Sequence, residues 1–213
     1  MRVSEIFFSL QGEGIYIGAP TVFVRLYGCD LRCEWCDTMY AVEGGEFRTM
    51  SVSEVVERVE GLRCKTVCIT GGEPLLQEEE VTELAAILLK GGYHILLETS
   101  GHMEPPPVFF DDGCVISLDC KCPGSAMESS TDFGLFRKLG EKDQLKFVIK
   151  DEADYLYAKG VLREHPTKAC VVFQPVGGTE MRWIADRVLR DKMRGVRVLP
   201  QLHKLIWGNK RGV

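Results

Sequence analysis

Short apolar runs alternate with amphipathic segments along most of the chain. The runs are rich in β-branched and aromatic residues and predict buried strands at 21–27, 66–70, 93–98, 115–118, 145–149 and 169–173. Segments with apolar residues at helical spacing predict helices from Ser51 onward and at about 78–90, 130–139, 151–162 and 179–191. Such alternation of strands and helices is typical of an α/β protein with a mainly parallel sheet and outer helices.

The predicted strands end in polar or glycine-rich stretches, at 28–36, 70–74, 98–101, 117–121, 146–150 and 174–175. Carboxyl ends of parallel strands meet at one edge of a sheet, so this edge is the expected place for a ligand site. The segment Glu104–Pro107 is different, because three consecutive prolines predict a stiff connection where a helix is expected.

Composition agrees with one compact domain over residues 1–213. The chain is 45% hydrophobic, which allows one substantial core. A formal net charge of −5 gives no reason to expect a nucleic-acid or membrane partner, and no apolar run approaches a membrane span. Nine cysteines, with no apolar signal sequence in residues 1–5, indicate metal binding in a reducing, cytoplasmic compartment rather than disulfides.

The most informative chemistry follows the first of these strands, where Cys29, Cys33 and Cys36 are spaced C-x3-C-x2-C. Three thiolates can hold three irons of a [4Fe-4S] cluster and leave the fourth iron open for a ligand. A zinc site is the main alternative, although structural zinc usually takes paired C-x2-C units. Ordinary buried cysteines are a second alternative, but their neighbours here are polar.

A second motif, Gly71-Gly72-Glu73-Pro74, ends the strand at 66–70. Glycines let a ligand approach the backbone, and the Glu73 carboxylate can pair with an ammonium group. With the cysteines, and with Trp35 before the last of them, this motif resembles the radical S-adenosylmethionine (SAM) superfamily. The resemblance implies that the open iron binds SAM and that the reduced cluster cleaves it to a 5′-deoxyadenosyl radical. Alone, the four residues would be an ordinary turn.

Further stretches narrow the resemblance: Ser9–Gly14, Arg25, Cys36-Asp37-Thr38 and Pro200–Gly208. Together they are similar to the 7-carboxy-7-deazaguanine synthase family. The family implies a partial TIM-type barrel, and the conversion of 6-carboxy-5,6,7,8-tetrahydropterin into 7-carboxy-7-deazaguanine with loss of ammonia. It also implies a [4Fe-4S] cluster, SAM and Mg²⁺ as cofactors, a flavodoxin- or ferredoxin-type electron donor, and a homodimer.

The resemblance also implies roles for individual residues. Substrate contacts fall on Leu10, Gln11, Gly12, Glu13, Arg25, Thr70 and His203, with the Arg25 guanidinium suited to a carboxylate. The residues implied to contact SAM are Trp35, Cys36, Asp37, Gly72, Glu73, Ser117, Lys121, Gln174 and Pro175. The Thr38 hydroxyl is implied to bind Mg²⁺. Taken singly, residues 11–14 also fit a polar hairpin turn, Arg25 a cation at a strand end, Thr38 a helix N-cap, and His203 a structural histidine.

Three wider alternatives stay open at this point. Asp119-x-Lys121 resembles the strand end of radical SAM activating enzymes, which form a glycyl radical on a protein partner; residues 11–13 and 201–203 would then lack a role. A non-enzymatic iron-sulfur or zinc protein is another possibility. Cys114, Cys120 and Cys122 could be ligands of a second cluster, although C-x5-C-x-C is unusual spacing for one.

Overall fold

The computed structural model describes all 213 residues. The fold is built on one nine-stranded sheet. Its strands are β1 (Arg2–Leu10), β2 (Pro20–Leu26), β3 (Arg48–Thr49), β4 (Thr66–Gly71), β5 (His94–Thr99), β6 (Cys114–Cys120), β7 (Gln144–Ile149), β8 (Cys170–Pro175) and β9 (Val196–Val198). They are ordered β3-β1-β2-β4-β5-β6-β7-β8-β9, and all pairs from β2 to β9 are parallel. The sheet does not close, which confirms the predicted partial barrel.

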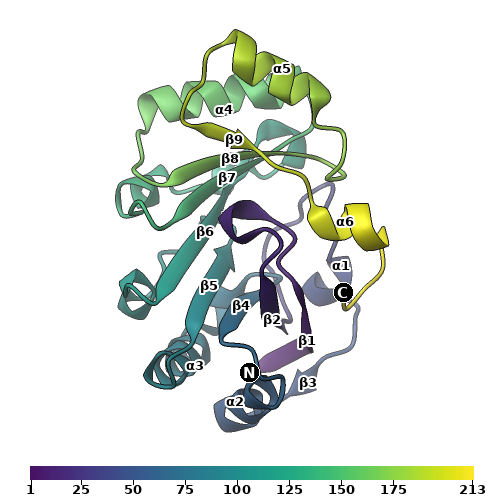
Figure 1. The fold of residues 1–213 in the computed structure, drawn as a ribbon, viewed down its shortest axis with the longest axis vertical. Coiled ribbons are helices and arrows are strands. Elements are labelled where there is room, and N and C mark those ends of the chain that lie inside the picture. The colour runs from purple at the N-terminus through teal and green to yellow at the C-terminus, as the bar shows by residue number, and fades with distance from the viewer.

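Four helices cover the outer face of this curved sheet: α2 (Val52–Gly61), α3 (Glu78–Lys90), α4 (Glu152–Glu164) and α5 (Arg182–Arg190). The short helix α1 (Met39–Val42) follows the cysteine loop, and α6 (Leu202–Trp207) lies at the open side (Figure 1). None of these helices combines the length and apolar composition that a membrane crossing requires.

The two faces of the strands have different contents. Outward side chains such as Ile69, Leu97 and Phe147 are fully buried in the main core beneath the helices. Inward side chains start with a small apolar floor of Phe23, Cys68, Leu96 and Val115, against which Phe7, Ile15 and Tyr16 pack. Above this floor the inward positions are polar, so the interior of the arc is built to hold a polar ligand.

Most predicted elements are confirmed to within a few residues, and α3 occupies the range predicted for it. The predicted helix at 130–139 is wrong, because this stretch forms 3₁₀ turns at Glu128–Ser130 and Phe133–Arg137. The Asp132 side chain accepts a hydrogen bond from Gly134 N at 2.8 Å, a local turn that competes with a continuous helix. Strands β1, β3 and β9 were not predicted.

The connection from β5 to β6 contains no α-helix, as the three prolines predicted. A 3₁₀ turn, Pro107–Phe110, takes the place of the helix. Its Phe109 is fully buried in the main core and fills space that a helix would otherwise cover.

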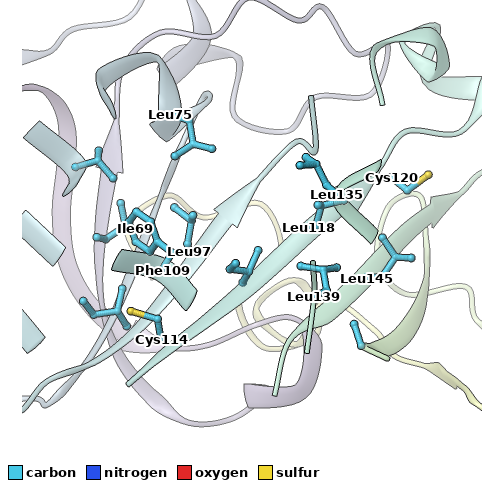
Figure 2. Packing of buried hydrophobic residues seen from close by; sticks show 14 of the residues in the cluster. Ile69, Leu75, Leu97, Phe109, Cys114, Leu118, Cys120, Leu135, Leu139 and Leu145 are labelled. Carbon is cyan, nitrogen blue, oxygen red and sulfur yellow. The ribbon is translucent and has the colours of Figure 1, made fainter. Parts of the chain in front are cut away.

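Cys114, Cys120 and Cys122 do not form the second cluster site that was left open as an alternative. Cys114 and Cys120 begin and end the same strand, β6, so roughly 20 Å of extended backbone separates them. Both belong to the apolar core on the outer face, and Figure 2 shows them at opposite ends of a row of buried side chains. Cys122 is also buried in this core. These thiols therefore act as small apolar side chains.

Replacing Phe147 by alanine tests the outer core. Its ring is fully buried and meets Phe173 edge-on, with ring centroids 5.6 Å apart. We expect Phe147→Ala to lower the free energy of unfolding by about 3–5 kcal/mol in chemical denaturation, because it leaves a cavity. The control Phe8→Ala, at a ring that is half exposed, should cost far less. Equal losses for the two variants would contradict this assignment of the core.

Candidate active site

A cavity of about 260 Å³ lies at the carboxyl ends of the parallel strands, inside the arc. Its lining includes residues from every strand from β1 to β8 except the edge strand β3, together with the cysteine loop and the segment around α6. The predicted site residues among them are Leu10, Gln11, Gly12, Glu13, Arg25, Cys29, Cys33, Trp35, Cys36, Asp37, Thr38, Thr70, Gly72, Ser117, Lys121, Gln174 and His203. The predicted convergence of strand ends is therefore confirmed.

The cysteine loop packs directly on the GGEP turn. Gly28 has a φ of +108°, a backbone conformation that favours glycine, and its carbonyl accepts a hydrogen bond from Glu73 N at 2.9 Å. A Cβ on Gly72 would collide with this carbonyl and with the Cys29 side chain, so only glycine allows the two turns to meet. The two motifs thus form one surface of the cavity.

The three thiols of this loop suit a multi-iron cluster better than a single ion. Cys29, Cys33 and Cys36 are partly exposed and all line the cavity. No three potential ligands are close enough together to hold one metal ion. Burial raises the pKa of Cys29 and of Cys33, so iron binding must displace their protons. The chemistry of the donor set fits three separate irons of one cluster.

Arg25 and Glu98 provide opposite charges on the inner wall. The Arg25 Nε donates to Glu5 at 2.8 Å, and Arg25 also lines the cavity. Glu98 accepts hydrogen bonds from Thr70 Oγ1 at 2.8 Å and from Gln11 Nε2 at 3.2 Å. The wall therefore offers a cation for an anionic group and a carboxylate for N–H donors.

A largely buried ion pair, with side chains 12% and 16% exposed, joins β7 to the loop after β1. Lys146 Nζ lies 2.7 Å from Glu13 Oε2, and Gln201 Nε2 donates to Glu13 Oε1 at 2.6 Å. Burial disfavours the charged carboxylate, but Lys146 and Gln201 outweigh it and lower the pKa of Glu13 to about 2. Burial likewise opposes the charge on Lys146, yet nearby carboxylates, Glu13 foremost, raise its pKa. Both groups are therefore ionised at neutral pH.

Residues 201–204 span the open side of the arc. Gln201 N donates to Gly178 O at 2.7 Å on the β8 side, and Leu202 N donates to Gly12 O at 2.8 Å on the β1 side. Lys204 Nζ pairs with Asp37, between Cys36 and Thr38, at 2.9 Å. This segment therefore connects both sides of the arc and the cysteine loop.

His203 packs against the backbone of Gly12 so closely that a Cβ on Gly12 would collide with its ring. Gly12 therefore provides the space in which His203 reaches the cavity, and a glycine at this position has a packing reason that the sequence alone does not give.

Two predicted SAM contacts lie outside the cavity lining. Pro175 is buried at the end of β8. Glu73 is fully buried, and its carboxylate accepts hydrogen bonds from Thr99 Oγ1, Leu75 N and both the N and Oγ of Ser100, at 2.5–3.0 Å. The Glu73 side chain is occupied in holding the end of β5, which leaves the glycine backbone to face the cavity.

Two buried acceptors near the cavity have no partner. They are Gln174 Oε1 and Asp119 Oδ1, and both residues line the cavity. Asp119 uses its other oxygen to pair with Lys121 Nζ at 2.9 Å. An unpaired buried acceptor is costly, so these atoms indicate where a donor on a bound ligand would be stabilised.

Sequence reasoning placed the strand ends and the 200–208 stretch at the site but gave no individual role to several residues there. They are Glu98, Asp119, Lys146, Gln201 and Lys204, which line the cavity, and Glu5, which was missed altogether and lies beside Arg25. A signal for some of them was present. Glu98 and Lys146 are charged residues inside otherwise apolar strands, at positions that alternate with buried ones. Period-two reading of those strands places both on the inner face.

Comparisons with known proteins agree with this geometry. Residues 23–108 match the model of the radical SAM superfamily. A 7-carboxy-7-deazaguanine synthase from Methanospirillum hungatei is 44% identical over 97% of this chain and 85% of its own length. Another, from Thermoplasma acidophilum, is 38% identical over the whole of both chains. The crystal structure of QueE from Escherichia coli shares the fold, with a TM-score of 0.76 over 93% of each chain, at 21% identity.

The chain belongs to the 7-carboxy-7-deazaguanine synthase family. It is accordingly a radical SAM enzyme, a class that uses a [4Fe-4S] cluster and SAM. In this family member the cysteine loop, the GGEP turn and the inner wall all meet in one cavity, at the carboxyl ends of the strands.

The Glu13 carboxylate gives this family member a pH-dependent stability. The pKa of Glu13 falls from 4.5 to about 2 on folding. Its contribution to the free energy of unfolding is therefore complete above pH 4.5 and is lost as the pH falls towards 2. We expect wild type to exceed Glu13→Gln by about 2–3 kcal/mol in unfolding free energy at pH 6. Urea unfolding of cluster-free protein should show this gap narrow below pH 4.5. The exposed control Glu164→Gln should show no such gap, and a gap that is constant with pH would contradict the ion pair.

Proposed function

We propose that this protein converts 6-carboxy-5,6,7,8-tetrahydropterin into 7-carboxy-7-deazaguanine with loss of ammonia, a step towards 7-deazapurines such as the precursors of queuosine or archaeosine. One observation carries the proposal: a single cavity combines the three thiols of the cysteine loop with Arg25, a cation on the inner wall. Relatives that match nearly the full chain bear the name of this activity.

The proposed cluster is held by Cys29, Cys33 and Cys36, and SAM lies beside it. When bound, the reduced cluster and SAM supply a 5′-deoxyadenosyl radical that removes a hydrogen from the substrate. Support for the SAM position comes from the bare backbone of Gly72 and from the unpaired Gln174 Oε1. Trp35, Asp37, Ser117 and Lys121 complete the proposed set, and they also line the cavity.

The proposed substrate position lies over the polar inner wall. Arg25 lies near the end of β2 and lines the same cavity as the cysteine loop, so by holding the pterin carboxylate it orients the substrate next to that loop. Gln11, Thr70 and Glu98 face the N–H groups of the ring, since they already share one hydrogen-bond network. The closing segment contributes His203, and Leu10, Gly12 and Glu13 line the same side.

A magnesium ion is proposed beside Thr38. The hydroxyl of Thr38 makes no capping hydrogen bond to α1, although the residue stands at the N-cap position. Its Oγ1 lies 3.7 Å from Cys36 Sγ and lines the cavity, so it is available to a hard cation near the cluster. The proposal also includes a flavodoxin- or ferredoxin-type electron donor, a cytoplasmic location and a homodimer, for which the exposed Leu205 and Ile206 of α6 offer apolar surface.

An anaerobic assay tests the function. Reconstituted, reduced protein is incubated with SAM, Mg²⁺ and 6-carboxy-tetrahydropterin, and products are analysed by mass spectrometry. We expect 7-carboxy-7-deazaguanine and 5′-deoxyadenosine from wild type, and neither from Cys33→Ala, which should also lose the cluster absorbance. Deoxyadenosine without the deazaguanine would refute the substrate, and absence of both would refute the enzyme class.

Thr38→Ala tests the magnesium position. We expect this variant to keep the cluster absorbance and to need roughly tenfold more Mg²⁺ for half-maximal activation, since one oxygen ligand is lost. Thr38→Ser is the matched control, because it keeps the hydroxyl and should respond to Mg²⁺ as wild type does. A Thr38→Ala variant with the wild-type Mg²⁺ response would sink this assignment.

A further inference from the structure

An irregularity in β1 turns Glu5 onto the inner face of the sheet, beside Arg25. Val3 pairs with Leu26 of β2, yet Glu5, two residues later, pairs with Arg25, so Ser4 is an extra residue in the ladder. In a regular strand Glu5 would share the face of Val3, which is buried in the outer core. The bulge places Glu5 on the inner face instead, beside Arg25.

Glu5 joins three side chains from different parts of the chain. Its Oε1 accepts hydrogen bonds from Arg25 Nε at 2.8 Å and from Tyr40 OH at 2.7 Å. Its Oε2 accepts one from Arg211 Nε at 3.0 Å, and the Arg211 guanidinium stacks on the Tyr40 ring at 3.8 Å. The carboxylate is 15% exposed, and these donors lower the pKa of Glu5 against the opposing effect of burial.

This arrangement decides which edge of Arg25 is free. The Nε is the only guanidinium nitrogen of Arg25 with a hydrogen-bond partner in the structure, and Glu5 occupies that side. The fork formed by its two Nη groups is left for a ligand, and this fork matches a carboxylate through two parallel hydrogen bonds. By occupying the Nε side, Glu5 therefore leaves a ligand carboxylate to bind Arg25 end-on, through the two Nη groups.

Arg211 offsets the charge that Glu5 brings to the site. Glu5 alone would repel a nearby carboxylate, but Arg25 and Arg211 share it, and with Glu98, which also acts on Arg25, these side chains carry no net charge. The ion pair between Glu5 and Arg211 also brings residues 211–213 to the site, where Val213 lines the cavity.

We propose that Glu5 is a positioning residue that fixes the Arg25 guanidinium end-on for the carboxylate of an anionic substrate, and that Arg211 supports it by fastening residues 211–213 beside the site. The proposal rests on the function proposed above, in which Arg25 binds the pterin carboxylate. It adds a residue that touches no substrate atom and acts through Arg25.

The test measures substrate affinity by calorimetry on anaerobically reconstituted, unreduced enzyme with SAM bound. The probes are 6-carboxy-tetrahydropterin and tetrahydropterin without the 6-carboxylate. We expect Glu5→Gln to weaken the carboxylate probe about tenfold and to leave the second probe and SAM unchanged, since one charge-assisted contact is lost. The matched control is Glu164→Gln, whose pair with Arg163 lies on the exposed surface of α4.

Arg211→Met provides a second variant at a half-exposed position, which is suitable even if Glu5→Gln folds poorly. It should weaken the carboxylate probe in the same direction and speed amide exchange in residues 208–213. Combining both substitutions should cost less than the sum of the two, because they act through one group.

The outcomes separate the two proposals. Equal weakening of both probes by Glu5→Gln would mean a general structural role and overturn the inference. So would unchanged affinity in a Glu5→Gln enzyme whose wild-type parent binds and converts the carboxylate probe. If wild type itself fails to bind that probe, the proposed function falls and the inference falls with it.

Discussion

An arc of strands that does not close leaves water access to charged groups in its interior, and the hydrogen bonds of residues 201–204 limit that access. Glu13 is the centre of this closure, because it accepts from Lys146 on β7 and from Gln201 in the closing segment. The same segment reaches Asp37 beside Cys36, one of the proposed cluster ligands. Glu13 thus links the β7 side of the arc to the closing segment, and the Lys204–Asp37 pair links that segment to the cysteine loop.

The strands divide the molecule into a dry and a polar half. Alternate residues of β4 to β8 pack under helices, and the residues between them face the cavity. Stability and ligand binding are thus assigned to opposite faces of the same strands, so substitutions on one face can change ligand binding without removing the outer core. The apolar floor below the polar wall seals the inner face at its other end.

Patterns with strong local causes were predictable. Helix α2, with Ser51 as its N-cap, has both hydrogen bonds of a capping box, and the loop that carries the three spaced cysteines lines the cavity. The helix predicted at 130–139 was wrong because a side-chain turn at Asp132 competes with helical hydrogen bonds, and an apolar pattern does not reveal such a turn.

The inward direction of the charged residues Glu98 and Lys146 could be predicted from the alternation of residues along their strands. Glu5 was not, because its direction depends on a bulge that only the pairing of β1 with β2 defines. Likewise, the saturation of Glu73 by Thr99 and Ser100 is a tertiary fact.

The location of the cysteines has a practical consequence for handling the protein. Only Cys29, Cys33 and Cys36 line the cavity, whereas Cys114, Cys120 and Cys122 are buried in the core on the far side of the sheet. Burial also raises the pKa of the Cys120 thiol to about 12 and that of Cys114 to about 11, so neither is a ready nucleophile. The sheet thus separates the partly exposed thiols at the cavity from those buried in the core. Iron and sulfide added to the folded protein will meet Cys29, Cys33 and Cys36, whereas an alkylating reagent will also meet the partly exposed Cys64 and Cys170 and leave these core cysteines protected.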